Sequence, residues 1–518
     1  MFMSEGTYPY IRGGVSSWIA QIVREMPDVR FGVCFLGSQE SDYEGIRYEL
    51  PENLVHLEVH YMFGNNTPPV EPLKGDKEGF EAIEKLYATF KAMDKHHPAK
   101  QPQGDDAPDE EEIVDFPDMI KHIDFYLNKV TFKDFLYSRR SWDFINKMYM
   151  QNCKDVPFID YFWTLRNIHR PIWILAEIAK TMPKTKVFHS PSTGYAGFLG
   201  ALCSYDRKRP FLLTEHGIYT RERKIDMLTA EWIDFQKPSL LKQPEEMNYI
   251  KRMWVNFFEK IGQFSYRRAD HILSLYPGAQ RIQHAFGADA TKTRVIPNGV
   301  DADALMATMK HRQDPPKPII TLIGRVVSIK DIKTFIRAIR ITMNAIPDVE
   351  AWIVGPTEED PEYYHECKNM VQALDLQSHM KFLGFQNIKE ILPKSALQTL
   401  TSISEGMPLV ILEGFAAGVP CVATNVGSCY DLINGGLDEY DINLGSAGAI
   451  TNIANPGELA KQYIHFLTNY DAWKKAQEVA LERVNRYYRQ ELFLKEYHDM
   501  YMEAMSYETP QEVKAEEV

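Results

Sequence analysis

With 518 residues and a formal net charge of −13, the chain is too long for one ordinary core and predicts two or three domains of roughly 100–200 residues each. Its acidic balance, 71 Asp and Glu against 58 Lys and Arg, disfavours nucleic acid and anionic lipid as main ligands, because backbone phosphates require a basic surface. The sequence has no apolar run of about 18 residues, no secretory signal at its start and no CxxC spacing among its six cysteines, so we expect a cytoplasmic protein without a zinc site or disulfide framework.

Short apolar stretches alternate with longer helical stretches along the chain, a pattern typical of a doubly wound α/β architecture. The strands expected in the first half are 29–36, 185–189, 211–216, 271–275 and 293–297. Those expected in the second half are 319–324, 350–355, 380–384, 396–400 and 420–424. The helices between them include 331–345, 361–374 and 408–417. Two Rossmann-like domains with a ligand cleft between them fit this pattern better than one large sheet.

Changes in composition divide the chain into four segments. A first Rossmann-like domain is expected over 1–303, in which a mobile polar loop and an aromatic helical insertion occupy 65–150. A second Rossmann-like domain is expected over 304–470. Residues 471–508 are expected to form helices, and 509–518 a disordered tail.

The start of the chain lacks most of an expected first strand. The stretch GTYPYIRGGVSSW (6–18) looks like the loop and helix that follow such a strand, yet only MFM precedes Ser4. Either that strand is unusually short or the chain begins late. Gly14, in the Gly-Gly pair before the helix, would permit a phosphate or sugar to approach the backbone, although such a pair is more often a simple turn and the GxGxxG spacing is absent.

The segment SEGMPLVILEGFAAGVPCVA (404–423) joins an expected strand to an expected helix. Pro408 suits the first turn of that helix, whose N–H groups and dipole form a natural anion site, and Gly406 permits close approach of a ligand. Glu413 lies in an apolar setting and needs partners, which are either ligand hydroxyls or a structural salt bridge. Glu405 lies on the loop itself, where functional residues concentrate.

Two further polar groups follow expected strands. Arg325 and Lys330, in IGRVVSIKD (323–331), are well placed for a diphosphate, with solvated surface charge as the alternative. His216, in LLTEHGIYTRERK (212–224), either lines a ligand site or is structural.

Taken together, these stretches resemble the retaining glycosyltransferases of family 4, which have the GT-B fold. The motifs that match in the family's order are IPNGVD (296–301), GRVVSIKDIKTFIRAI (324–339), VGP (354–356), KFLGF (381–385) and the 404–423 segment. The pair of glutamates with E-x7-E spacing, Glu405 and Glu413, is the most specific mark. The first half is similar to the PelF-type enzymes of Pel exopolysaccharide synthesis through EGTYPYIRGGVSSW and LLTEHGIYTRERKIDML.

The resemblance implies a role for each residue that matches a donor-site motif. Arg325 and Lys330 would neutralise the donor diphosphate. Glu413 would hold the ribose hydroxyls, and Glu405 the hydroxyls of the donor sugar. Sugar and phosphate oxygens would bind the backbone of four residues, namely Gly406, Met407, Pro408 and Leu409.

The resemblance also implies roles for further residues, whose motifs match the family less directly. Phe385 would border the base, Gly14 would approach the diphosphate from the first domain, and His216 would lie by the sugar near the reaction centre. The candidates for the acceptor side are Tyr8, Tyr219 and Arg221, and for Tyr219 and Arg221 exposure to solvent is the alternative. In such folds the C-terminal helices cross back to the first domain, which binds the acceptor while the second binds the nucleotide sugar.

The resemblance therefore implies a UDP-hexose-dependent transferase, with UDP-glucose as the leading donor, that extends a polysaccharide, namely the Pel-type exopolysaccharide. It implies no cofactor and no metal, and partners among the inner-membrane proteins of a Pel complex. The alternative is a UDP-sugar-binding assembly component of a polysaccharide export complex with little turnover. The acidic loop 94–115 and the aromatic insertion 117–150, as partner surfaces, motivate that alternative.

Overall fold

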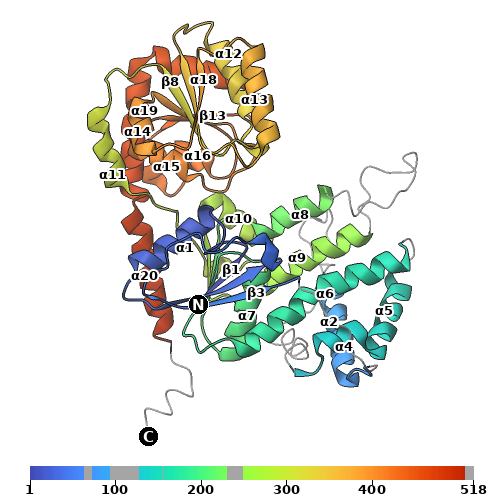
Figure 1. Ribbon diagram of the computed structural model, residues 1–518. Coiled ribbons are helices and arrows are strands. Elements are labelled where there is room, and N and C mark those ends of the chain that lie inside the picture. The colour runs from blue at the N-terminus through green and yellow to red at the C-terminus, as the bar shows by residue number, and fades with distance from the viewer. Residues whose placement is uncertain (64–72, 94–127, 154–155, 230–248, 508–518) are drawn as a thin grey trace, which may run out of the picture. The chain divides into compact units, whose positions relative to one another are not determined.

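The computed structural model describes residues 1–63, 73–93, 128–153, 156–229 and 249–507 (Figure 1). They form two compact units. The first unit comprises residues 1–273, 281–294 and the chain from Met500 onward, and the second comprises 274–280 and 295–499. The expected loop 94–115 and tail 509–518 lie outside the described residues, as do the first residues of the insertion 117–150.

The first unit contains a seven-stranded sheet in the order β3-β2-β1-β4-β5-β6-β7. Its strands are β1 (Phe2–Glu5), β2 (Phe31–Gly37), β3 (Leu54–Tyr61), β4 (Phe188–Ser190), β5 (Phe211–Glu215), β6 (His271–Ser274) and β7 (Thr293–Val295). Strand β1 pairs in parallel with both β2 and β4, so the strand order reverses between β1 and β4. The short strand at the start of the chain thus takes a central position, and its Phe2, Met3 and Ser4 are buried.

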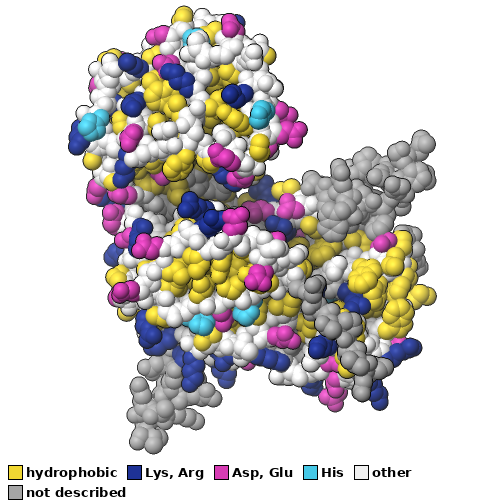
Figure 2. Space-filling model, viewed as in Figure 1, with side chains coloured by type: hydrophobic (Ala, Val, Ile, Leu, Met, Phe, Trp, Pro, Cys, Tyr) yellow, Lys and Arg dark blue, Asp and Glu magenta, His cyan; other side chains and the backbone are white. Residues whose placement is uncertain are grey.

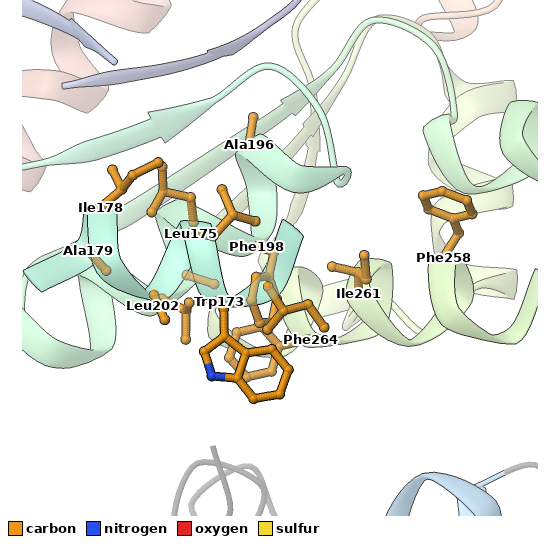
Figure 3. Close-up of a cluster of buried hydrophobic side chains, with 14 of the residues drawn as sticks. Trp173, Leu175, Ile178, Ala179, Ala196, Phe198, Leu202, Phe258, Ile261 and Phe264 are labelled. Atoms are coloured by element: carbon orange, nitrogen blue, oxygen red, sulfur yellow. The ribbon is translucent and has the colours of Figure 1, made fainter. Parts of the chain in front are cut away.

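The helices of the first unit cover both the sheet and one another. They are α1 (Gly14–Glu25), α2 (Lys77–Met93), α4 (Phe132–Tyr137), α5 (Arg139–Asn152), α6 (Phe158–Thr181), α7 (Tyr195–Arg207), α8 (Tyr219–Thr229) and α9 (Tyr249–Arg268), followed by α10 (Pro277–Ala285), which is shared between the units. Figure 3 shows how apolar side chains of α6, α7 and α9, among them Trp173, Phe198 and Phe264, gather in one core. The indole N–H of Trp173 donates to the Val130 carbonyl at 2.7 Å, which ties the inserted helices to this core.

The second unit contains a six-stranded sheet in the order β10-β9-β8-β11-β12-β13, in which every neighbouring pair is parallel. Its strands are β8 (Ile319–Ile323), β9 (Glu350–Val354), β10 (Met380–Gly384), β11 (Leu397–Leu400), β12 (Cys421–Thr424) and β13 (Gly448–Thr451). Apolar clusters lie on its two faces, as expected for parallel strands buried on both sides. The strand order reverses between β8 and β11. The prediction of two doubly wound, Rossmann-like units is therefore confirmed.

The helices of the second unit fill the connections between its strands. They are α11 (Ala302–Met306), α12 (Ile332–Thr342), α13 (Pro361–Ala373), α14 (Ile388–Ile391), α15 (Leu409–Ala416), α16 (Cys429–Asn434), α17 (Glu439–Asn443), α18 (Pro456–Thr468) and α19 (Tyr470–Tyr487), followed by α20 (Gln490–Met505). The side chain of Asp331 caps α12 by accepting from the Thr334 N–H, and Asp360 caps α13 from the residue before Pro361.

The structure corrects where the C-terminal helices pack. The sequence places all of 471–508 against the first domain, but α19 belongs to the second unit, where Val479, Ala480 and Val484 share a core with residues of α15. Only the chain from Met500 belongs to the first unit, and there the Tyr501 hydroxyl lies 2.6 Å from His189 Nδ1. The apolar stripe of α19 decides its position, because that stripe continues the core beside α15.

The boundary between the units also differs from the expected one after Asp303. The second unit takes up the chain from Val295, because the Val300 N–H donates to the Tyr488 carbonyl and the Gln490 N–H donates back to Val300. A Cβ at Gly299 would lie 2.5 Å from the Arg489 carbonyl oxygen, so this close pairing needs a glycine.

Charged side chains of both signs are interspersed on the face that Figure 2 draws, and hydrophobic side chains gather in places between them. Exposed large apolar residues of α5 and α6 are Trp142, Met150, Ile159 and Trp163. Among the described residues, no helix is both long enough and apolar enough to cross a membrane.

Candidate functional site

Lys330 and Glu405 meet where the strand order of the second sheet reverses. Lys330 ends the short loop after β8, and Glu405 lies in the loop between β11 and α15. The Lys330 Nζ lies 2.5 Å from the Glu405 Oε1, and the two side chains are only 21% and 13% exposed. Open parallel sheets bind ligands at the carboxyl ends of their strands, beside the reversal of strand order. The ion pair therefore occupies the position where such a unit binds its ligand.

Backbone and side-chain hydrogen bonds hold the two loops together. The Thr401 hydroxyl donates to the Lys330 carbonyl at 2.8 Å, and the Ile403 N–H donates to the Ile329 carbonyl at 2.9 Å. The Ser402 hydroxyl donates to the same carboxylate oxygen of Glu405 that accepts from Lys330. This carboxylate is therefore oriented by two donors from the loops that follow the adjacent strands β8 and β11.

The start of α15 leaves backbone donors available beside Glu405. Helix α15 begins at Leu409, with Pro408 as its N-cap, and no side chain caps its first turn. The Ser428 N–H donates to the Gly406 carbonyl at 2.9 Å, so the segment that leads into α15 is hydrogen-bonded to the loop after β12. A Cβ at Gly427, whose φ is +53°, would lie 2.3 Å from the carbonyl oxygens of both Glu405 and Gly406. Glycine at this position is needed for the loops to pack so closely.

Glu413 lies within α15, one helical turn after Leu409 and on the same face of the helix. Its side chain is partly buried, and burial raises the pKa of its carboxyl group. Among the residues that the structure describes, Glu413 has no ion pair and no side-chain hydrogen bond. The structural salt bridge that was the alternative for Glu413 is therefore not formed with any described residue.

Arg325 and Phe385 lie along the same edge of the sheet. Arg325 follows β8 and pairs with Glu359 at 2.5 Å, while both side chains remain about half exposed. Phe385 follows β10 and is 85% exposed. Gly355 lets the loop after β9 pass beside the Arg325 loop, because a Cβ there would lie 2.0 Å from the Gly324 carbonyl oxygen. An exposed aromatic ring, two cations and a carboxylate thus follow β10, β8 and β11.

In the first unit, His216 follows β5 and packs edge-on against Trp18, with ring centroids 4.6 Å apart. Its Nε2 is buried and has no hydrogen-bond partner among the described residues. Burial lowers the pKa of His216 to about 3, so the ring is neutral near pH 7. The preceding Glu215 accepts hydrogen bonds from Tyr266 and Gln283, and burial raises its pKa to about 7.

Glu5 is a candidate that the sequence analysis missed. It ends β1, at the reversal of strand order in the first sheet, and its carboxylate accepts from the Ala196 N–H and the Tyr219 hydroxyl, both at 3.1 Å. Burial raises the pKa of its carboxyl group. The signal in the sequence is a lone carboxylate at the end of an apolar strand, which was hidden because the strand is so short.

The remaining first-unit candidates differ in accessibility. Tyr8 is fully buried and its ring lies 5.3 Å from that of Tyr48, so its assignment to the acceptor side stays a prediction that this burial does not favour. Tyr219 is directed to Glu5, whereas Arg221 is exposed. Gly14 begins α1, and no atom lies within 4 Å of a Cβ built on it.

The sequence Asp301-Ala302-Asp303, which resembles a metal-binding DxD, serves structural roles. Asp301 caps α11 by accepting from the Ala304 N–H, and Asp303 pairs with Arg489 at 2.6 Å.

Comparison with known proteins identifies the class of the second unit. Residues 308–483 match the family described as Glycosyl transferases group 1. Residues 1–291, more than half of the chain, match the family described as Domain of unknown function (DUF3492), and the chain belongs to this family.

The curated relatives match this chain over only part of their own length. Over 177 residues the chain is 32% identical to the UDP-Gal:alpha-D-GlcNAc-diphosphoundecaprenol alpha-1,3-galactosyltransferase of Escherichia coli, which covers 32% of this chain and 44% of that protein. Over 188 residues it is 28% identical to the N-acetyl-alpha-D-glucosaminyl L-malate synthase of Bacillus anthracis, which covers 36% and 46%. The chain thus spans less than half the length of these relatives.

Solved structures share the fold at low identity. Sucrose-phosphate synthase from Thermosynechococcus elongatus superposes with a TM-score of 0.52 at 14% identity, over 95% of this chain and 93% of that chain. Anabaena Alr3699/HepE in complex with UDP gives a TM-score of 0.50 at 19% identity, over 64% and 82%. The fold of the chain is accordingly GT-B, as the sequence predicted.

Proposed function

We propose that the chain is a retaining glycosyltransferase of family 4 that transfers a hexose from a UDP-sugar, with UDP-glucose as the favoured donor, to a growing polysaccharide. The observation that carries the proposal is the Lys330–Glu405 ion pair at the reversal of strand order in the second sheet. The match of this unit to Glycosyl transferases group 1 supports it. The PelF-type motifs of the first half make Pel exopolysaccharide the proposed product and proteins of a Pel complex the proposed partners.

The order of the residues along the sheet edge suits an extended nucleotide sugar. Phe385 follows β10, Arg325 and Lys330 follow β8, and Glu405 follows β11. These strands are three neighbour steps apart, about 14 Å at the usual strand spacing. A single small anion is too short to contact residues spread over this distance. A nucleotide sugar would contact all of them, with its base on the Phe385 ring, its diphosphate at the cations and its sugar at Glu405.

The diphosphate would also use the uncapped first turn of α15, from the backbone of Gly406 to Leu409. Glu413, whose carboxylate has no described partner, would accept hydrogen bonds from the ribose hydroxyls. Glu405 would exchange its bond with Lys330 for a bond from a sugar hydroxyl, because the diphosphate competes for the lysine. From the first unit, Gly14 and His216 remain proposed donor contacts.

In the proposed reaction, the bond between the anomeric carbon and the diphosphate oxygen breaks, and a bond to the acceptor oxygen forms on the same face of the sugar. The acceptor proton passes to the leaving phosphate oxygen. Arg325, Lys330 and the N–H groups of α15 would stabilise the negative charge of the departing diphosphate, which is an electrostatic role and requires no metal.

The test is release of UDP from UDP-glucose by the full chain, compared with other UDP, GDP and ADP sugars. We expect Lys330→Ala, Arg325→Ala and Glu405→Ala to lower turnover about 100-fold or more. The matched control is Lys333→Ala, which removes a neighbouring lysine whose exposed partner is Glu366, and it should change turnover less than about twofold. Unchanged rates in all three site variants would contradict the proposal. Binding of UDP-glucose without turnover would instead favour the assembly component.

A further inference from the structure

Polar side chains capable of binding a metal line one face of the edge strand β3. His56, Glu58 and His60 are spaced by two residues, so their side chains point to the same face of the sheet. The parallel register pairs Glu58 with Cys34 of β2. A thiol, a carboxylate and two imidazoles therefore lie on one side of two adjacent strands.

The ligand atoms are close enough to surround one ion. The Cys34 Sγ, a Glu58 carboxylate oxygen and a His60 ring nitrogen all lie within 4.8 Å of one another. The His60 Nε2 is 3.7 Å from the Glu58 Oε1, and the His56 Nε2 is 3.3 Å from the Glu58 Oε2. Ligands held tetrahedrally at zinc–ligand distances of about 2.0–2.3 Å are themselves roughly 3.5 Å apart.

Two of these atoms lack the partner that buried polar atoms ordinarily have. The Glu58 Oε1 and the His60 Nε2 are both buried, and neither makes a hydrogen bond of ordinary geometry among the described residues, although the Cys34 thiol and the His60 ring are close enough to interact with the Glu58 carboxylate. They face each other at a distance too long for a hydrogen bond. A cation between them would satisfy both atoms.

The surroundings are apolar on the Cys34 side, whereas the Glu58, His60 and His56 side chains are 19%, 31% and 38% exposed. Cys34 is fully buried, and Leu36, which the register pairs with His60, is buried beside it. An apolar wall of this kind limits access of water and strengthens the binding of a charged ion.

We propose that Cys34, Glu58 and His60 bind a divalent transition-metal ion of the zinc class, with His56 or a water as the fourth ligand. Zinc accepts thiolate, imidazole and carboxylate ligands together, whereas magnesium and calcium select oxygen ligands. On binding, the S–H bond of Cys34 breaks, its sulfur coordinates the ion and the proton passes to solvent. The ion would clamp the edge strand β3 to β2.

None of the residues of this site is a residue proposed for the transferase chemistry, because its ligands lie on the strands β2 and β3. It also revises the expectation of no zinc site. That expectation depended on CxxC spacing, whereas strand pairing joins Cys34 to ligands on a separate strand.

The first test is cobalt binding to the full chain after treatment with a chelator. We expect one equivalent of Co²⁺ to bind, with the near-ultraviolet thiolate-to-cobalt band and visible bands of a tetrahedral site, and Zn²⁺ to displace it. Failure to bind one equivalent, or binding without the thiolate band, would overturn the proposal.

Variants then assign the ligands. Cys34→Ser should abolish the thiolate band, whereas Cys367→Ser, which alters a buried free cysteine in the second unit, should leave it intact. Zn²⁺ should raise the Tm of the wild type and of Cys367→Ser by mass action. If Cys34→Ser does not fold, Glu58→Gln and His60→Gln serve instead, each with zinc affinity lowered about 100-fold or more. Zinc affinity unchanged in His60→Gln would overturn the assignment.

Discussion

Lys330 and Glu405 are 75 residues apart in the sequence, yet their side chains form an ion pair of 2.5 Å across the neighbouring strands β8 and β11. Each side chain is positioned by the other, and the Ser402 hydroxyl adds a second donor to the carboxylate. Because both residues lie in one network, replacing one disturbs the position of the other.

The first prediction concerns this coupling. In a double-mutant cycle on kcat/KM with UDP-glucose, Lys330→Ala and Glu405→Ala should be non-additive by about 0.5–3 kcal/mol, because residues in contact lose a shared interaction only once. The partly exposed pair Lys333–Glu366, whose side chains are 29% and 51% exposed, is the control cycle and should give no more than about 1 kcal/mol. Full additivity at the Lys330–Glu405 pair would show that the two residues act independently.

The second prediction concerns Phe385. Because its ring is 85% exposed, Phe385→Ala should leave the Tm nearly unchanged while it weakens UDP binding. The loss of base stacking is expected to cost about 1–3 kcal/mol, or roughly 5- to 150-fold in Kd. Ile341→Ala, at an exposed apolar residue of α12, should change neither quantity. Calorimetric titration with UDP measures the effect, and equal Kd values for Phe385→Ala and wild type would exclude the stacking role.

The third prediction separates backbone strain from steric clash at two glycines with positive φ. Gly445 has φ of +93° and open space around it, so Gly445→Ala should cost about 1–2 kcal/mol from strain alone. Gly427→Ala adds a Cβ 2.3 Å from the Glu405 and Gly406 carbonyl oxygens and should cost clearly more. It should also lower turnover, because those residues must shift. Thermal unfolding measures the loss of stability, and UDP release measures turnover. An equal loss of stability in the two variants would mean that the loops around Gly427 move apart without a further energetic cost.

The fourth prediction concerns pH and the buried Glu215, whose folded-state pKa is raised by burial from 4.5 to about 7. Below about pH 4.5 the carboxyl group is protonated in both states. Between about pH 4.5 and 7 only the unfolded state loses its proton, so the free energy of unfolding falls as pH rises, by up to roughly 3 kcal/mol at about 1.4 kcal/mol per unit.

Glu215→Gln should remove this contribution, so the difference in stability between the variant and the wild type should shift in favour of the variant as pH rises. Urea unfolding at several pH values measures the difference. Glu439→Gln, on the exposed surface of α17, is the control for the loss of one formal charge. A pH-independent difference for Glu215→Gln would contradict the raised pKa.

The strands could be predicted from the sequence wherever they are continuous apolar runs. Strands such as β8 and β11 are buried on both faces, and their sequences show it directly. The strands β3 and β13 were not predicted, and β1 was foreseen only as one of two alternatives, an unusually short first strand. Strand β1 spans only Phe2–Glu5, β13 only Gly448–Thr451, and β3 carries the alternating His56, Glu58 and His60 that suit an edge strand.

The candidate site was predictable as a set of separate residues but not as an arrangement. Loop position and residue type singled out Lys330, Glu405 and Glu413, and apolar surroundings indicated that Glu413 is buried. Nothing in the local pattern revealed that Lys330 contacts Glu405, that Tyr8 is buried, or that Glu5 ends a central strand.

The sequence by itself determined most of the element types and the two Rossmann-like units, and it singled out candidate residues for a phosphorylated ligand, because periodicity and residue chemistry are local properties. The tertiary structure decided which residues meet. Strand β11 pairs with β8 although β9 and β10 intervene along the chain, and β3 brings Glu58 beside Cys34. Strand order and register depend on long-range hydrogen bonding and on the packing of helices over both faces of the sheet. A short stretch of residues therefore does not determine either the order or the register.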